Sequence, residues 1–116
     1  MAKPEPAPQD QDAFADRRLY PRVPVALPAS LQAGEERHSV QLLDVSAGGA
    51  KLNCAVRIAV GTTVTLDCGL LARTAVVRWQ NGGMMGVMFE SELDSRVVSA
   101  LTERSRALEA LMQTRE

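Results

Sequence analysis

The sequence is poor in the residues that form catalytic centres and metal sites. Its 116 residues include one histidine and two cysteines, Cys54 and Cys68, which are not in a CxxC pair. An enzyme would need a nucleophile with a base, two convergent carboxylates or a set of metal ligands, and no such arrangement is visible. We therefore expect no enzyme, no metal and no cofactor, and we expect both cysteines to be buried free thiols.

Aromatic residues, net charge and long apolar runs are also scarce. Aromatic residues make up 3% of the chain and the formal charge is -1. A domain for single-stranded nucleic acid would want stacking aromatics in a basic groove, so this class ranks last. No apolar run approaches the roughly 18 residues of a membrane span, and the N-terminus lacks an apolar signal core. We expect a cytoplasmic protein that binds neither nucleic acid nor membrane.

The first 16 residues differ in composition from the rest. They are rich in Pro, Ala, Gln and Asp, and Phe14 is their only large apolar side chain after Met1. Such a segment cannot offset the entropy cost of ordering, so we expect a disordered tail over residues 1–16. The remainder is long enough for one domain with one core, which we place at residues 17–114.

Short runs of alternating apolar and polar residues fill the region from 23 to 90. Pro24 and Pro28 remove two backbone donors from the first run, which predicts an edge strand or a bulge. Asn81-Gly82-Gly83 predicts a hairpin turn. Six strands without intervening helices predict an antiparallel β-barrel, closed or nearly closed, with an aliphatic core. The expected strands are 23–31, 37–43, 50–54, 64–68, 70–79 and 84–89.

After residue 90 the apolar spacing becomes helical. Ser91-x-x-Asp94 resembles a capping box, and the pattern predicts an amphipathic helix over residues 92–113. We favour an apolar stripe that packs across the barrel of a monomer. The alternative is a stripe that extends past the barrel and pairs with another subunit, although Glu103–Arg106 interrupts it and disfavours a long coiled coil.

Residues 17–22 bring three arginines together directly after the acidic tail. Arg18 and Arg22 have RxxxR spacing, but Pro21 argues against a helix and favours an extended arm. Guanidinium groups bind phosphate bidentately, match the O6 and N7 acceptors of guanine and stack on bases. Taken alone, the cluster is better explained as a solvated basic patch.

Residues 44–49, with the sequence DVSAGG, form a turn with residue types that also bind nucleotides. A tight hairpin would account for all of them. Alternatively, Asp44 could accept from the donor edge of guanine, Ser46 could bind phosphate or fix the turn, and Gly49 could let a ligand approach the backbone. Taken alone, this segment supports a simple hairpin turn and a nucleotide-binding turn equally well.

Two further side chains have equally open roles. Trp79 could flank a bound base or plug the barrel, and its position in a strand somewhat favours the core. Lys51 should point outward near any bound phosphate if Ala50 points inward, although it could be an ordinary solvated lysine.

Together, RxxxR before the first strand and DxSxxG between the second and third resemble the PilZ domain family and its two-part cyclic di-GMP motif. Residues 75–90, with their Gly-Val-x-Phe ending, look like that family's late hairpin, and the similarity covers Arg17 to the C-terminus. The resemblance implies a six-stranded PilZ-type β-barrel from a bacterial second-messenger receptor, with the arginine arm of residues 17–22 closing over cyclic di-GMP on its outer surface.

The residues that match the family's motif are expected to have the binding roles that the family assigns to those positions. The resemblance implies that Arg18 and Arg22 hold phosphate and guanine, and that Asp44 reads a guanine edge. Arg17 is similar to an arginine of family members that bind two intercalated ligand molecules, which predicts that stoichiometry. With Trp79 as a residue that flanks the base, the predicted site comprises Arg17, Arg18, Arg22, Asp44, Ser46, Gly49 and Trp79.

Two functions are compatible with this pattern. In the first, the arm becomes ordered around cyclic di-GMP and the receptor signals to a partner protein in trans. In the second, the chain is a nucleotide-independent adaptor of the same fold, as PilZ relatives without the arginines are thought to be. The intact arginines favour the receptor.

Overall fold

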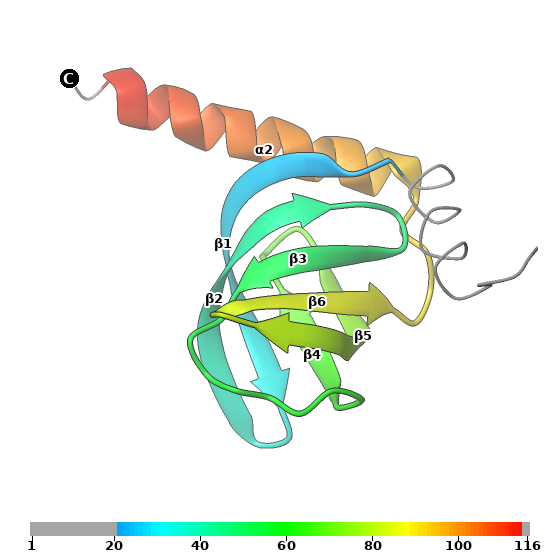
Figure 1. Cartoon of the computed structure of the whole chain (residues 1–116). Helices are drawn as coiled ribbons and strands as arrows, with labels where there is room; N and C mark the ends of the chain where they lie inside the picture. Colours follow the sequence, from blue (N-terminus) through cyan, green and yellow to red (C-terminus); the bar gives the residue numbers. More distant parts are fainter. Residues whose placement is uncertain (1–20, 115–116) are drawn as a thin grey trace, which may run out of the picture.

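Six strands form a closed antiparallel barrel, and a helix follows them (Figure 1). The computed structural model describes residues 21–114, and the side chains of residues 21–112. The order around the barrel is β1-β2-β3-β6-β5-β4, and β4 returns to β1. The predicted barrel with its C-terminal helix is confirmed, whereas the expected disordered tail lies outside the described residues. The elements are β1 Val23–Ala33, β2 Glu36–Val45, β3 Gly49–Asn53, β4 Thr63–Asp67, β5 Ala72–Asn81, β6 Met84–Phe89 and α2 Ser95–Thr114.

The barrel interior is filled by aliphatic side chains from alternate strand positions. Every second residue of a strand points to the same face, so one set of side chains converges on the axis. Phe89 is the one aromatic side chain in this core within residues 21–112. The fully buried members include Leu31, Leu42, Leu52, Val64, Leu66, Val77 and Met85.

A bulge in β1 accommodates its prolines. β1 pairs with both β2 and β4, so the edge-strand alternative is wrong, and the register shift between Pro24 and Leu27 confirms the bulge. The amide of Ala26 lies in this bulge and donates to the Ser105 hydroxyl of α2 at 2.9 Å. Ser105 is buried, so the helix supplies the hydrogen-bond acceptor that the interrupted β-ladder does not.

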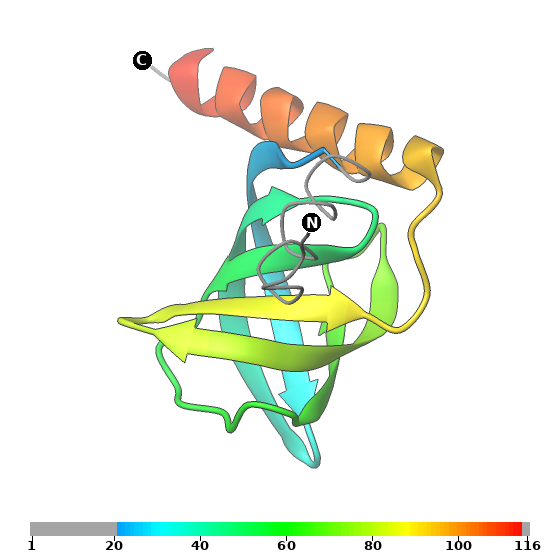
Figure 2. The same cartoon turned by 45° about the vertical axis from the view of Figure 1, so that its right-hand side comes forward.

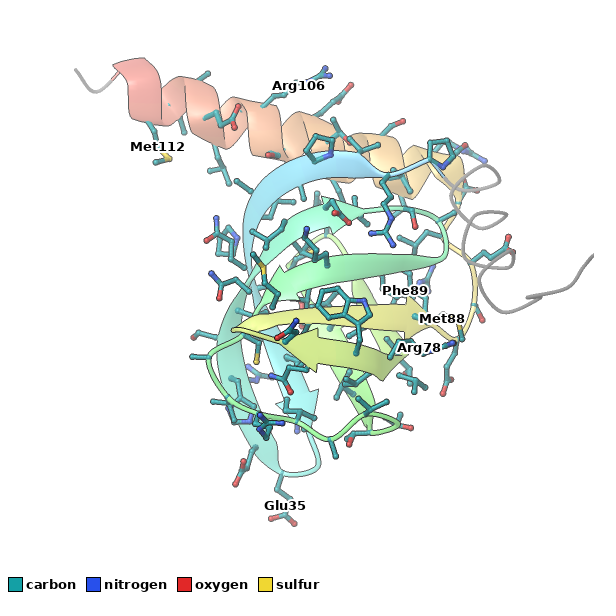
Figure 3. The ribbon with its side chains drawn as sticks, in the orientation of Figure 1. Glu35, Arg78, Met88, Phe89, Arg106 and Met112 are labelled. Atoms are coloured by element: carbon teal, nitrogen blue, oxygen red, sulfur yellow. The ribbon has the colours of Figure 1, made fainter. Side chains whose placement is uncertain are left out.

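Helix α2 lies across one end of the barrel, alongside β1 (Figure 2). Leu101 from the helix and Leu93 just before it join the barrel core, so the first half of the stripe packs as expected. Met112, near the far end of α2, is exposed (Figure 3). Pairing of that end with another subunit stays an untested alternative.

The helix begins three residues later than predicted. Its N-cap is Asp94, whose carboxylate accepts from the Arg96 amide at 2.8 Å, and not Ser91. The amide of Leu93 donates to the Ala47 carbonyl at 2.8 Å, which ties the preceding link to the β2–β3 turn. Residues 91–93 therefore form a link between β6 and the helix.

The fifth strand also begins two residues later than predicted. The amide of Cys68 donates to the Leu71 carbonyl at 2.9 Å, and Gly69 has a φ of 91°. Residues 68–71 therefore form the turn that joins β4 to β5. Such a turn reverses the chain before β5 can begin.

Both cysteines are free in the structure. Cys54 is buried, and Cys68 is partly buried. Burial raises the pKa of the Cys68 thiol above its usual value of 9.0, so this group remains protonated at neutral pH. No group of three potential metal ligands occurs within residues 21–114, and no helix there is long and apolar enough to span a membrane.

Candidate functional site

A groove of about 570 Å³ lies on the outer face of the barrel, over β3, β6 and β5 and beside the β2–β3 turn. Its volume is in the range of pockets that hold one small-molecule ligand. Basic, apolar and backbone groups share its lining, which suits a ligand with both charged and aromatic parts. The lining residues that matter here are Arg22, Ser46, Gly49, Lys51, Arg78 and Trp79.

The strand register aligns three groove residues across the outer face. Lys51 of β3 lies opposite Gly86 of β6, and Gly86 lies opposite Trp79 of β5. A side chain on Gly86 would overlap the indole ring of Trp79, so the ring lies directly against this glycine. The Trp79 ring therefore covers Gly86 on the outer face of β6.

The interpretation of Trp79 as a barrel plug is wrong. Trp79 is 41% exposed, because a bulge in β5 changes the direction in which its side chain points. Val77 pairs with Val87 and Trp79 pairs with Gly86, which leaves Arg78 as the extra residue of the bulge. Regular alternation from the buried Val77 would have turned Trp79 inward. The bulge instead places Arg78 and Trp79 together on the groove.

The β2–β3 turn forms the opposite wall, and Ser46 holds it together. The Ser46 hydroxyl accepts from the amides of Gly48 at 3.3 Å and Gly49 at 3.2 Å, and the Ser46 amide donates to the Gly49 carbonyl at 2.9 Å. Of the two roles predicted for Ser46, fixing the turn is observed. The Phe89 amide donates to the Gly48 carbonyl at 2.9 Å, which fastens the turn to β6.

Gly49 is required by close packing between strands. A side chain at this position would overlap the Val87 carbonyl oxygen of β6. The glycine thus lets β3 and β6 approach closely at the base of the groove. The predicted role of Gly49 was to let a ligand approach the backbone, and the observed role is close packing between two strands. In both cases the absence of a side chain leaves the groove surface open at this position.

Arg22 and Asp44 bring the two motif halves together. The guanidinium of Arg22 lies 3.0 Å from the Asp44 carboxylate, although the residues are 22 positions apart. The Arg22 side chain is 52% exposed and lines the groove, while Asp44 is 17% exposed and lies behind it. Arg17 and Arg18 lie outside the described residues. The structure thus assembles Arg22, Asp44, Ser46, Gly49 and Trp79 around one groove.

The groove has more basic character than the whole chain. Arg22 is neutralised in part by Asp44, whereas Lys51 and Arg78 have no ion pair among residues 21–112. Glu90 and Glu92 line it as well. Lys51 points outward beside the buried Ala50, as predicted. Lys51 and Arg78 are therefore available to an anionic ligand.

Sequence reasoning missed Arg78 and Gly86. Neither residue belongs to the RxxxR or DxSxxG pattern, and Arg78 would count as an ordinary exposed strand residue. The only available signal was the small residue Gly86 in an otherwise apolar strand, since a glycine in a strand often marks close approach of another group. The bulge that pairs it with Trp79 had no local signature.

The structure is that of a small β-barrel domain with a groove on its outer face. A model of the PilZ domain matches residues 16–106, and the chain belongs to this family. None of the curated proteins compared with the chain matches it.

Solved structures support the same fold. The PilZ domain of CeSA from a cellulose-synthesizing bacterium is 17% identical with a TM-score of 0.54, and the match covers 76% of this chain and 97% of that one. The Bacillus subtilis inhibitor of motility MotI/DgrA is 21% identical with a TM-score of 0.59. Borreliella burgdorferi PlzA, solved in complex with c-di-GMP, is 12% identical with a TM-score of 0.57. Both latter matches cover 86% of this chain, but only 54% of MotI/DgrA and 50% of PlzA.

Proposed function

We propose that this chain is a cyclic di-GMP receptor domain that binds its ligand in the groove between the β2–β3 turn and the β5 bulge. The observation that carries the proposal is the meeting of Arg22 with Asp44 beside Ser46 and Gly49, at the edge of this groove. Guanidinium groups suit both the phosphates and the guanine acceptors of this ligand. Trp79 offers an exposed ring on which a base can stack.

On ligand binding, residues 17–22 become ordered over the groove. Arg22 exchanges part of its contact with Asp44 for the ligand, at small cost, because partly exposed ion pairs contribute only about 0–1 kcal/mol. Asp44 then becomes available to the donor edge of guanine. The reshaped surface is read by a partner protein in trans, in the cytoplasm.

Calorimetric titration with cyclic di-GMP tests the receptor directly. Arg18→Ala and Arg22→Ala should each weaken binding by at least ~1.5 kcal/mol, since hydrogen bonds to charged groups contribute about that much. Arg37→Ala is the matched control, because Arg37 is an exposed arginine beside the β1–β2 turn, outside the groove. Absence of binding at high micromolar ligand would refute the receptor and favour the nucleotide-independent adaptor.

We further propose that two intercalated ligand molecules bind each domain, with Arg17 contacting the second. The same titration gives the ratio of ligand to protein, which should be two for the natural chain and one for Arg17→Leu. The physical reason is that the second molecule's phosphates lose a bidentate partner. A ratio of one in both proteins contradicts this proposal and leaves the receptor intact.

A further inference from the structure

Arg78 occupies the wall of the groove opposite the β2–β3 turn. It is the extra residue of the β5 bulge, so its side chain and that of Trp79 both lie on the outer face. Its guanidinium lies 3.2 Å from the Met88 sulfur of β6, and Figure 3 shows the two side chains next to each other. A thioether is only a weak acceptor, so most of the donor capacity of Arg78 remains available.

The position of Arg78 favours contact with a base over contact with a phosphate. Arg22 and Lys51 already supply positive charge at the β1 and β3 side of the groove. A base stacked on Trp79 lies parallel to the indole ring and presents its edges to the residues beside that ring. Arg78 is the adjacent residue in the chain, and the planar fork of a guanidinium matches the O6 and N7 acceptors of guanine.

We infer that Arg78 is a specificity-determining residue that reads the O6 and N7 edge of a guanine stacked on Trp79. This inference rests on the proposed function and adds a contact outside both sequence motifs. It also gives the β5 bulge a role: one extra residue places a stacking ring and a base-reading fork side by side. Regular pairing would present only one of these two side chains at this level of the groove.

The test is a thermodynamic cycle that combines one change in the protein with one change in the ligand. Affinity is measured for the natural chain and for Arg78→Met, each with cyclic di-GMP and with the analogue in which both guanines are 7-deazaguanine and lack the N7 acceptor. Either change alone should lower the affinity about tenfold, which corresponds to ~1.4 kcal/mol. In the Arg78→Met variant the analogue should cost clearly less affinity than it costs in the natural chain, because the hydrogen bond from Arg78 to N7 is already lost.

Controls separate this inference from the proposed function. Arg37→Met removes an exposed arginine outside the groove and should leave both affinities unchanged, and Arg78→Lys should restore little, because an ammonium has no planar fork. Circular dichroism verifies that each variant is folded. If the natural chain binds no cyclic di-GMP, the proposed function fails. Two results would overturn only the proposed contact between Arg78 and guanine. In the first, the natural chain binds cyclic di-GMP and Arg78→Met binds it with an affinity within twofold. In the second, the loss of affinity caused by the analogue is the same in the variant as in the natural chain.

Discussion

The two walls of the groove are built in different ways. The β2–β3 turn is held by its own residues, because the Ser46 hydroxyl accepts from the amides of Gly48 and Gly49. Within residues 21–112, no side-chain hydrogen bond links the residues of the β5 bulge to one another. It is fixed by pairing with β6, where Trp79 lies against Gly86. One wall thus has hydrogen bonds within its own turn in addition to its contacts with β6, whereas the other depends on strand pairing with β6.

A glycine supports each wall, but the atoms above the two glycines differ. At Gly49 the nearest neighbour is the Val87 backbone carbonyl, whereas at Gly86 it is the side chain of Trp79. A backbone carbonyl can move only if the strands separate, while a half-exposed indole can rotate. A substitution at Gly49 should therefore mainly lower the stability of the fold. A substitution at Gly86 should mainly weaken ligand binding.

The largest expected effect is that of Gly49→Ala. The added methyl group would force β3 and β6 apart, and overpacking of this kind costs about 3 kcal/mol in the free energy of unfolding. Urea denaturation measures it. Gly34→Ala is the control, because its positive φ of 63° is unfavourable for alanine but the space around it is open, which should cost about 1 kcal/mol. Equal losses would contradict the close approach at Gly49.

A smaller loss of stability is expected from Ser46→Ala. The change leaves the amides of Gly48 and Gly49 without their acceptor, at a cost of about 1–2 kcal/mol measured by urea denaturation. Ser39→Ala is a matched control, since Ser39 is exposed in β2 and should change stability by less than about 0.5 kcal/mol. A Ser46 variant as stable as the control would show that the turn does not depend on its hydroxyl.

The smallest effect on stability is expected from Gly86→Ala. Its methyl group displaces the Trp79 ring instead of the backbone, so the cost in unfolding free energy should be about 1 kcal/mol or less. Binding of cyclic di-GMP should nevertheless weaken severalfold, because the stacking surface moves. Trp79 is the only tryptophan of the chain, so its fluorescence reports this displacement directly. If neither the fluorescence emission nor the affinity changed, the conclusion that the Trp79 ring lies against Gly86 would be wrong.

Several features could be predicted because they depend on neighbouring residues in the chain. Alternation identified the six strands, and Asn81-Gly82-Gly83 identified a hairpin in which Gly82 and Gly83 have positive φ. The start of α2 was misplaced, because Ser91 and Asp94 are both suitable N-cap residues and the structure uses Asp94. The outward direction of Trp79 depends on the β5–β6 register, which the sequence around it does not reveal.

By itself, the sequence determined the six strands, the C-terminal helix and the DxSxxG turn, because each follows from residues within a few positions of one another. Only the tertiary structure decided that Arg22 meets Asp44, that Trp79 faces the groove and that Arg78 stands beside it. The physical reason is that barrel closure and strand register set these positions. Both arise from pairing between segments far apart in the chain.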